Sequence, residues 1–491
     1  MKNSKLKSIK FLSLFCILHF AFCICAVAQE TQPAPGKPRS AQIPAVQERK
    51  LPNGLTVAVV ERRSVPLVTV QLLVRSGASN EGMEKAGLAN LTAALLTKGT
   101  KTRTATQIAE EMEFLGGSIN TSAGWNSSSV VVTALSSRID PAMAIMADVV
   151  LNPTFKQEEL DLLKSQTLDG LTYNLKQPGF LATYVASRYS FGEHPSGGTP
   201  ASLKAISRED ITAFHSSGYV TDSAVLIFAG DITAAQAEAL AQKYFGGWNN
   251  KSGIKQDTEG PRAMKNGSAP VRRILVVDLP KSGQAAVNYT KNLQGASRTN
   301  NTLYYPASVL NSVLGGGYSS RLNQEIRIKR GLSYGAGSSF AWRFDKSNFG
   351  TRTQTKNESA AEVAELVMAE IKKLTEGAIA DTELIPRKSV LTGNFGRNLE
   401  TTAGLAAQLA ELYNFGLPAT VLNAYMNDVQ TVTDKQIRDF ASANLMGGDI
   451  IIVGDYSVFK ADLAKRFPNM QIEVVKADDL DLSKDNLRKS N

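Results

Sequence analysis

The sequence contains one internal repeat, and this repeat constrains the fold more than any other feature. The apolar stretch SAVLIFAGDI contains Gly230, and GDIIIVGDY contains Gly454, 224 positions later. QEELDLLKSQ and DTELIPRKSV share a leucine, a lysine and a serine at the same offset, and Phe214 and Phe440 are 226 positions apart. A near-constant offset over separated segments predicts a tandem duplication of one domain.

Each repeat mixes strand and helix patterns. LTVAVVE, LVTVQLLVRSG and SSSVVVTAL are rich in β-branched residues, which is typical of strands. ATQIAEEMEFLG, DPAMAIMADVVLN, REDITAFHSSG and the run 158–175 have helical spacing of apolar residues. These patterns predict an α+β fold of two tandem domains, each a mixed β-sheet with packed helices.

Shifts in composition predict the domain boundaries. Residues 29–46 hold four prolines, and residues 250–270 are rich in Gly, Pro, Lys and Ser without an apolar period. We expect a signal peptide over 1–28, a Pro-rich linker over 29–46, a first domain over 47–250, a linker over 251–270, a second domain over 271–475 and a charged tail over 476–491.

The first 28 residues have the three parts of a secretory signal. Four lysines in the first ten residues precede an apolar stretch that ends in Ala26-Val27-Ala28. We expect cleavage after Ala28 and not a membrane anchor, because roughly 18 apolar residues are short for a span and no basic cluster follows. The product is then exported without stable membrane insertion, and periplasmic if the source is Gram-negative.

Cysteines and charge exclude several classes of protein. All three cysteines lie within the first 28 residues, so the mature chain has no disulfide and no thiolate metal site. The net charge is +9, but four of the 54 basic residues are lysines of the signal, and the others are scattered. The sequence therefore predicts no nucleic-acid binding.

Several motifs resemble one peptidase family. LPNGLTVAVVERRSVPLVTVQLLVRSGASNE, GLANLTAALLTKGT, FLGGSIN and the GDI strand follow one another in the order of the pitrilysin (insulinase) family of zinc metallopeptidases, which includes the mitochondrial processing peptidases. The resemblance runs from about Gln47 to Tyr456 and includes the duplication. It implies a fold in which each domain forms part of a half-chamber for peptides.

The resemblance also shows what this chain lacks. In active members the helix corresponding to GLANLTAALLTKGT carries an H-x-x-E-H motif, in which two histidines bind zinc and the glutamate acts as general base. The corresponding residues here are Asn90, Ala93 and Ala94. Alanine offers no lone pair and an amide is a poor substitute for imidazole, so we predict that this chain holds no metal.

The mature chain offers no replacement ligands. It contains two histidines, His194 and His215, which are 21 residues apart and which we expect to be structural. Asp169 lies where the family has its third ligand, a glutamate, and we expect it to be a solvated surface carboxylate.

A second family motif is present. GGGYSSRLNQEIRIKRGLSYGAGSSF supplies Arg327 late in a predicted helix, Gly331 as a left-handed stop and Tyr334 at the start of the next strand. Such a return brings Arg327 and Tyr334 together. The resemblance implies that they hold a substrate carbonyl and a developing oxyanion; the alternative is a solvated arginine and a half-buried strand tyrosine.

Two glycine-containing segments are candidates for substrate binding. Gly116, Gly117, Ser118 and Asn120 belong to FLGGSIN, which matches the family's edge strand, to which a substrate adds as an extra strand. The alternative for Gly116 and Gly117 is a plain helix stop.

The second segment is Gly315, Gly316 and Gly317. We expect a tight strand-to-helix turn here, because GGGYSS lacks the lysine of a phosphate-binding loop. The run also resembles the glycine-rich loop of the non-catalytic processing-peptidase subunit.

The resemblance, together with the predicted signal peptide, thus implies the non-catalytic subunit of an exported heterodimeric zinc metalloprotease. This chain would bring Arg327 and Tyr334 and no cofactor, and a homologous partner would bring zinc and the H-x-x-E-H motif to cleave a peptide substrate. The alternative is a peptide-binding or scaffold protein without a peptidase partner. An active peptidase with unfamiliar ligands is the least favoured hypothesis.

Overall fold

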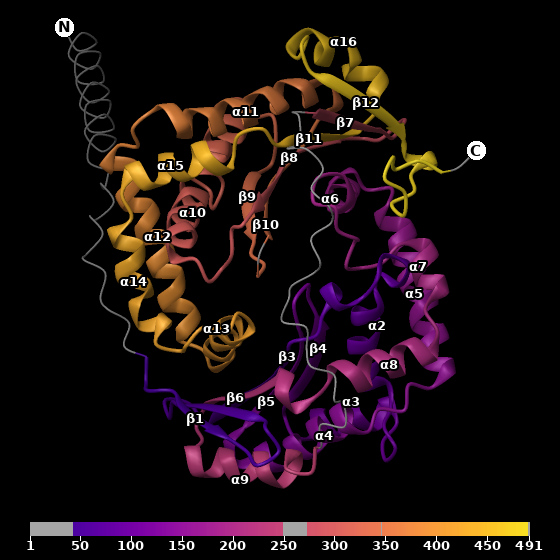
Figure 1. Cartoon of the computed structure of the whole chain (residues 1–491), viewed down its shortest axis with the longest axis vertical. Coiled ribbons are helices and arrows are strands. Elements are labelled where there is room, and N and C mark those ends of the chain that lie inside the picture. Colours follow the sequence, from indigo (N-terminus) through magenta and orange to yellow (C-terminus); the bar gives the residue numbers. More distant parts are fainter. Residues whose placement is uncertain (1–42, 249–272, 345, 490–491) are drawn as a thin grey trace, which may run out of the picture. The chain divides into compact units, whose positions relative to one another are not determined.

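Two mixed β-sheets with packed helices form the described part of the chain (Figure 1). The computed structural model describes residues 43–248, 273–344 and 346–489. Each sheet has six strands. The α+β fold with two sheets that the sequence predicts is therefore confirmed, whereas the predicted signal peptide and the predicted linker 251–270 lie outside the described residues.

The first half contains β1 (Gln47–Lys50), β2 (Thr56–Glu61), β3 (Leu67–Val74), β4 (Ser118–Ala123), β5 (Ser128–Leu135) and β6 (Ala224–Gly230). Its helices are α2 (Leu88–Leu95), α3 (Ala105–Phe114), α4 (Ile139–Leu151), α5 (Gln157–Asn174), α6 (Pro178–Tyr189), α7 (Pro200–Ala205), α8 (Arg208–Gly218) and α9 (Ala234–Phe245).

The second half contains β7 (Arg273–Asp278), β8 (Ala285–Gln294), β9 (Ala336–Ala341), β10 (Lys346–Thr355), β11 (Asp449–Gly454) and β12 (Gln471–Lys476). Its helices are α10 (Asn301–Leu314), α11 (Ala360–Glu376), α12 (Asp381–Leu399), α13 (Thr402–Asn414), α14 (Val421–Thr431), α15 (Asp434–Asn444) and α16 (Tyr456–Arg466), and a π-helix covers Asn323–Ile328.

The strand order repeats between the two sheets. Five strands run β2-β6-β3-β5-β4 in the first sheet and β7-β11-β8-β10-β9 in the second. In each sheet the first of these pairs is parallel and the other three are antiparallel. The sixth strand differs, because β1 pairs antiparallel with β2 and β12 pairs parallel with β7. The duplication thus accounts for five strands of each sheet.

Local sequence explains the strands and helices. β6 and β11, AVLIFAG and DIIIVG, are buried at every position, as expected for continuous apolar strands that are covered on both faces. The Thr104 hydroxyl accepts from the backbone N–H of Gln107 and starts α3, and Thr433 starts α15 in the same way. The helices and strands predicted in the first repeat are all present.

The two halves exchange a helix. α6 of the first half packs against β8 and β11 of the second sheet, and α13 of the second half packs against β3 and β6 of the first (Figure 1). These helices start at Pro178 and Thr402, which are 224 positions apart, as in the sequence repeat. The Oγ1 atoms of Thr69 and Thr402 lie 2.8 Å apart where α13 meets β3. One helix of each half therefore packs on the sheet of the other half.

The exchanged helices merge the hydrophobic cores. Leu181 and Val185 of α6 share one cluster with Val277 and Ile451 of the second sheet. Leu409 of α13 belongs to another cluster, with apolar residues of β2 and β6. Unfolding one half would expose apolar surface of the other, which couples their stabilities.

The end of the chain covers α6. Leu482 and Leu487 are buried in the same cluster as α6, and Arg188 of α6 forms an ion pair with Asp485. The segment predicted as a charged tail therefore also contributes apolar packing.

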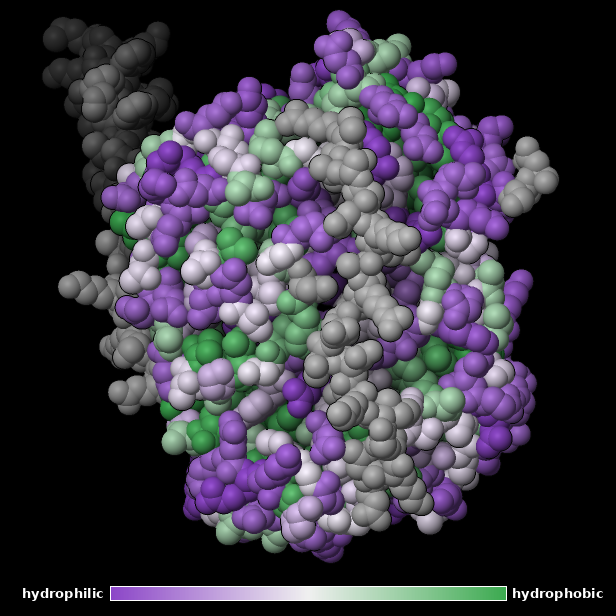
Figure 2. Space-filling model, viewed as in Figure 1, coloured by the Kyte–Doolittle hydropathy of each residue, from purple (hydrophilic) through white to green (hydrophobic). Residues whose placement is uncertain are grey.

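The surface is mostly hydrophilic. Figure 2 shows hydrophilic residues over much of the face in view, with hydrophobic residues in separate small groups. None of the helices in the described ranges combines the length and hydrophobicity that a membrane span requires.

Candidate functional site

The α2 helix carries the three positions at which the resemblance places the zinc motif. Its N-terminus is preceded by Gly87 in a left-handed conformation, with φ of 96°. The Asn90 side-chain amide donates a hydrogen bond of 2.6 Å to the Ser196 carbonyl, and Ala93 is 1% exposed. Asn90 therefore ties α2 to a neighbouring loop, and Ala93 is a core residue.

These residues do not fit a zinc ion. An alanine methyl cannot coordinate a metal, and the Asn90 side-chain amide already donates a hydrogen bond to Ser196. Across the described ranges, no group of three or more His, Cys, Asp or Glu side chains is placed to hold a metal ion. Asp169 is exposed on α5, as the sequence predicts.

Both histidines of the described chain are held by backbone carbonyls. The Nε2 atom of His194 lies 3.0 Å from the Ala78 carbonyl oxygen, and Nε2 of His215 lies 2.9 Å from that of Val150. Burial lowers the pKa of His215, whose ring stacks on Tyr219. These contacts agree with the structural roles that the sequence predicts.

Arg327 and Tyr334 lie side by side. The guanidinium carbon of Arg327 is 4.8 Å from the centre of the Tyr334 ring, within cation–π range. Gly331 between them has φ of 64°, so the predicted left-handed stop is confirmed. Tyr334 lies two residues before β9 and not at the start of the strand, and it is 90% exposed. The alternative of a half-buried strand tyrosine is therefore wrong.

A second tyrosine completes this group. The Arg327 guanidinium carbon is also 5.0 Å from the centre of the Tyr318 ring, which is 65% exposed. The Arg327 side chain makes no hydrogen bond or ion pair with any described residue. It lies on the π-helix, a distortion that is frequent at functional sites. We call Tyr318, Arg327 and Tyr334 the Arg/Tyr cluster; in the described ranges its side-chain donors have no hydrogen-bond partner.

The glycine run has a different place from the one predicted. Gly315 follows the end of α10, so Gly315, Gly316 and Gly317 link two helical segments and not a strand to a helix. The Gly315 carbonyl accepts from the backbone N–H of Ser338 in β9 at 3.2 Å. A Cβ at Gly315 would lie 2.3 Å from that nitrogen, so only glycine allows this approach. Gly315 thus lets its own backbone contact the backbone of β9, a contact that the sequence pattern does not predict.

The outer edges of the two sheets differ. In β9, Ser338 donates to Gly315, and the Ala336 N–H donates to the Asn323 side chain at 3.3 Å. The equivalent edge strand β4 contains Ser118 and Asn120, and in the described part of the chain its backbone hydrogen-bonds only to β5. The predicted edge strand is confirmed, and β4 is the open edge of the pair.

Gly116 and Gly117 form the turn between α3 and β4. Gly116 has φ of 63°, and a Cβ at Gly117 would lie 2.9 Å from the Thr133 carbonyl of β5. Gly116 therefore does act as a helix stop, and Gly117 lets the edge strand approach β5 closely.

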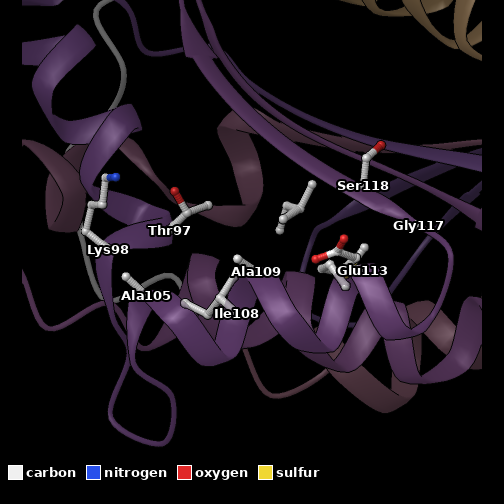
Figure 3. Close-up of a pocket in the computed structure, with 10 residues that line it drawn as sticks. Thr97, Lys98, Ala105, Ile108, Ala109, Glu113, Gly117 and Ser118 are labelled. Carbon is white, nitrogen blue, oxygen red and sulfur yellow. The ribbon is translucent and has the colours of Figure 1, made fainter.

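A hollow of about 330 Å³ lies beside β4 (Figure 3). Its floor is apolar and is formed by α3 and the start of β4, with Ile108 and Met112 nearly buried. Thr97 and Lys98 lie at one end of the hollow, and Glu113 lies at the other. A peptide strand paired with β4 would have room here for a side chain.

Comparisons with known proteins agree with this architecture. The profile "Insulinase (Peptidase family M16)" matches residues 56–176, and the profile "Peptidase M16 inactive domain" matches residues 205–388. The chain belongs to the insulinase (peptidase M16) family. The first match contains α2 and β4, and the second contains the Arg/Tyr cluster.

Relatives in the insulinase family carry different names. A protein of Rickettsia bellii called "Uncharacterized zinc protease" is 27% identical, with 81% of this chain and 96% of the relative aligned. A Helicobacter pylori protein called "Non-peptidase homolog YmxG" is 25% identical, with 82% and 91% aligned. The family thus includes relatives that are named as proteases and as non-peptidases.

Solved structures confirm the insulinase-family fold. A "peptidase M16 inactive domain" from Pseudomonas fluorescens is 26% identical with a TM-score of 0.76, covering 83% of this chain and 98% of that one. A protease from H. pylori has a TM-score of 0.78 at 20% identity, covering 84% and 100%. The inactive-domain profile, the relative named a non-peptidase homolog and the P. fluorescens structure together support an inactive peptidase-like fold.

Sequence reasoning missed two residues of this region. Tyr318 stands in the glycine-rich run, but nothing in the spacing shows that its ring lies against Arg327. Glu81 precedes α2 by seven residues, yet its carboxylate accepts from the backbone N–H groups of Gly87 and Ala89 at 2.7 and 2.6 Å. A buried glutamate of this kind caps a helix from outside the usual N-cap position.

Proposed function

We propose that this chain is the non-catalytic subunit of an exported heterodimeric zinc metalloprotease of the insulinase family. It would present a peptide and stabilise charge during hydrolysis, while a homologous partner brings zinc and the general base. The single observation that carries this proposal is the Arg/Tyr cluster: its side chains make no hydrogen bond to another described residue, whereas the residues at the zinc-motif positions have structural roles.

The Arg/Tyr cluster has the chemistry for this role. A guanidinium that makes no protein hydrogen bond can donate to a substrate carbonyl and to the oxyanion that develops from it. The Tyr334 hydroxyl is a second donor within the same cluster, and its exposure leaves it accessible to a peptide. Such donors act on charge that develops in the transition state, so they add rate without a metal of their own.

The β4 edge supplies the second part of the role. The outer side of β4 has no backbone partner among the described residues and can pair with an extended peptide as a further strand, and the hollow between α3 and β4 can take an apolar side chain. Ser118 and Asn120 are exposed along this edge. Gly315 and Asn323 accept from two backbone N–H groups of the equivalent edge strand β9, which favours strand addition at β4.

The second candidate is a peptide-binding or scaffold protein without a peptidase partner. The β4 edge and its hollow favour this candidate, because strand addition needs neither zinc nor Arg327. The two candidates differ in one requirement. Only the subunit hypothesis needs the donors of the Arg/Tyr cluster.

Co-expression with a homologous protein that carries H-x-x-E-H tests the proposal. Peptide cleavage should appear only in the mixture, and Arg327→Ala or Tyr334→Phe should lower turnover while size-exclusion chromatography still shows the complex. Unchanged turnover in both variants would favour the scaffold candidate. Lys329→Ala, an exposed cation two residues from Arg327, is the matched control and should have no effect.

Export is part of the proposal and has its own test. The tripartite N-terminus supports cleavage after Ala28. The intact mass of the protein recovered from the periplasm or medium should correspond to a chain that starts at Gln29. A mass that includes residues 1–28 would mean that the segment is retained as an anchor.

A further inference from the structure

The start of α2 depends on a glutamate that is sealed from solvent. The Glu81 side chain is 0% exposed, and its two oxygens accept from Gly87 and Ala89 at the first turn of the helix. Gly87 has no side chain with which to cap α2. The orientation of α2 at this end is therefore held by Glu81.

His194 faces Glu81 in an environment of oxygens. Its Nε2 lies 3.0 Å from the Ala78 carbonyl, and its Nδ1 lies 3.4 Å from the Pro195 carbonyl and 3.7 Å from Oε1 of Glu81. A carbonyl can only accept, so Nε2 must carry a proton. Without a further proton, the Nδ1 lone pair would face a carbonyl and a carboxylate. The geometry thus favours one extra proton shared between Glu81 and His194.

The residues just before His194 contact the second half of the chain. Ser190 Oγ donates to Asp449 at 2.9 Å, and the Phe191 carbonyl accepts from Lys346 at 2.7 Å. Glu193 forms an ion pair of 3.0 Å with Arg343. The segment 190–193 is therefore attached to β10, β11 and the β9–β10 connection, and His194 is its next residue.

We propose that Glu81 and His194 form a proton-dependent switch that couples the start of α2 to the contacts between the two halves. With the shared proton in place, a hydrogen bond or ion pair joins the α2 cap to the segment 190–194. After loss of the proton, the lone pairs of Glu81 Oε1 and His194 Nδ1 face and repel each other. This connection then loosens. Acidification tightens the connection, and alkaline pH releases it.

The surroundings set the range in which the switch works. Burial raises the pKa of Glu81 to about 7, against the lowering effect of the α2 backbone N–H groups. The charged groups nearby are engaged elsewhere: Lys85 on the same loop pairs with Asp210 of α8 at 2.6 Å, and Arg343 pairs with Glu193. Arg343 lies 4.5 Å over the Trp125 ring, and the centre of that ring is 5.0 Å from the centre of the His194 ring. The exposed Glu84 lies on the same loop as Glu81.

Hydrogen exchange of the full chain, measured by mass spectrometry between pH 5.5 and 8.5 and corrected for intrinsic rates, tests this proposal. We expect protection of the amides of residues 86–92 to fall roughly tenfold as pH rises through 7, because the folded protein then loses the shared proton. Glu81→Gln cannot titrate and should remove this step. Glu84→Gln, an exposed glutamate on the same loop, should keep it.

Two outcomes would overturn the proposal. One is a wild-type protection profile without a step near pH 7, and the other is a step that Glu81→Gln leaves unchanged. If Glu81→Gln does not fold, the ring signals of His194 in wild type and in Glu84→Gln provide the second measurement, with His215→Gln to assign them. A His194 signal that does not change between pH 6 and 8 would also overturn the proposal.

Discussion

Asn90 donates a 2.6 Å hydrogen bond from its side-chain amide to the carbonyl oxygen of Ser196. This bond joins α2 to the loop that follows the exchanged helix α6. The first position of the zinc motif therefore holds two segments of the protein together, and its neighbour Ala93 packs in the core. Replacing these residues by zinc ligands would therefore remove contacts that stabilise the fold.

The first prediction concerns metal binding. The purified chain should bind no stoichiometric zinc, because Asn90, Ala93 and Ala94 offer no ligand set. The triple variant Asn90→His, Ala93→Glu, Ala94→His should not become an enzyme, since the third ligand and the groups that orient the histidines are missing. Elemental analysis and a peptide-cleavage assay check both statements. One tightly bound zinc per wild-type chain would contradict them.

Ala93→Glu alone should also destabilise the protein. Burying a carboxylate at a position that is almost closed to solvent costs about 2 kcal/mol or more of unfolding free energy. Ala109→Glu is the matched control, because Ala109 is exposed on α3 and should tolerate the same change. Denaturant titration of both variants measures the difference. Equal stability would mean that α2 moves freely enough to solvate the new charge.

The third prediction distinguishes the roles of Arg327 and Tyr318 in the Arg/Tyr cluster. In the mixed complex, loss of Arg327 should reduce turnover about a hundredfold, or roughly 3 kcal/mol, the usual effect of removing a transition-state donor. Tyr318→Phe keeps the ring beside Arg327 and should retain activity, whereas Tyr318→Ala should lower kcat severalfold through a misplaced guanidinium. Steady-state kinetics distinguishes these variants. A hydroxyl-dependent loss in Tyr318→Phe would instead make Tyr318 a direct donor.

Much of this architecture is predictable from the sequence, because its causes are local. Apolar alternation and capping residues locate β5, α3 and α15, and the offset of 224 reveals the duplication. The exchange of α6 and α13 is not predictable in this way, because an offset relates two helices without saying on which sheet each packs.

The missed parts of the site depend on contacts that follow no regular helix or strand spacing. Tyr318 contacts Arg327 on the π-helix, nine positions further along the chain, and Glu81 caps α2 from the preceding loop. The strand-to-helix turn expected at Gly315 is wrong for the same reason. Gly315 permits a close approach to β9, and the sequence does not show which segment approaches.

The fourth prediction concerns the dependence of stability on pH. The stabilising contribution of one buried group falls as pH rises, and that of another falls as pH is lowered. The folded-state pKa of Glu81 is raised to about 7 from 4.5, so its contribution is complete below pH 4.5 and is lost as pH rises through 7. This amounts to about 3 kcal/mol. The pKa of His215 is lowered, so its contribution is present above pH 6.5 and is lost as pH falls below that value.

Chemical denaturation from pH 5.5 to 8.5 resolves the two groups. Glu81→Gln should flatten the decline between pH 5.5 and 8, and His215→Gln should flatten the loss on the acid side only. If Glu81→Gln changed only the acid side of the profile and His215→Gln only the decline toward alkaline pH, the result would contradict the burial of these side chains.

The last prediction concerns the exchanged helices. Leu409 lies on α13 in the second half, yet its fully buried side chain packs with β2 and β6 of the first sheet. Leu409→Ala should therefore destabilise the first half by about 2–5 kcal/mol through a cavity that α13 cannot fill. Because each half lends a helix to the other, we expect a single cooperative transition, with fluorescence of Trp125 in the first half and Trp342 in the second changing together. The exposed Thr420 before α14 provides a control, since Thr420→Ala removes no buried contact. Two separate transitions in wild type would show that the halves unfold independently and that the exchanged helices contribute little to their coupling.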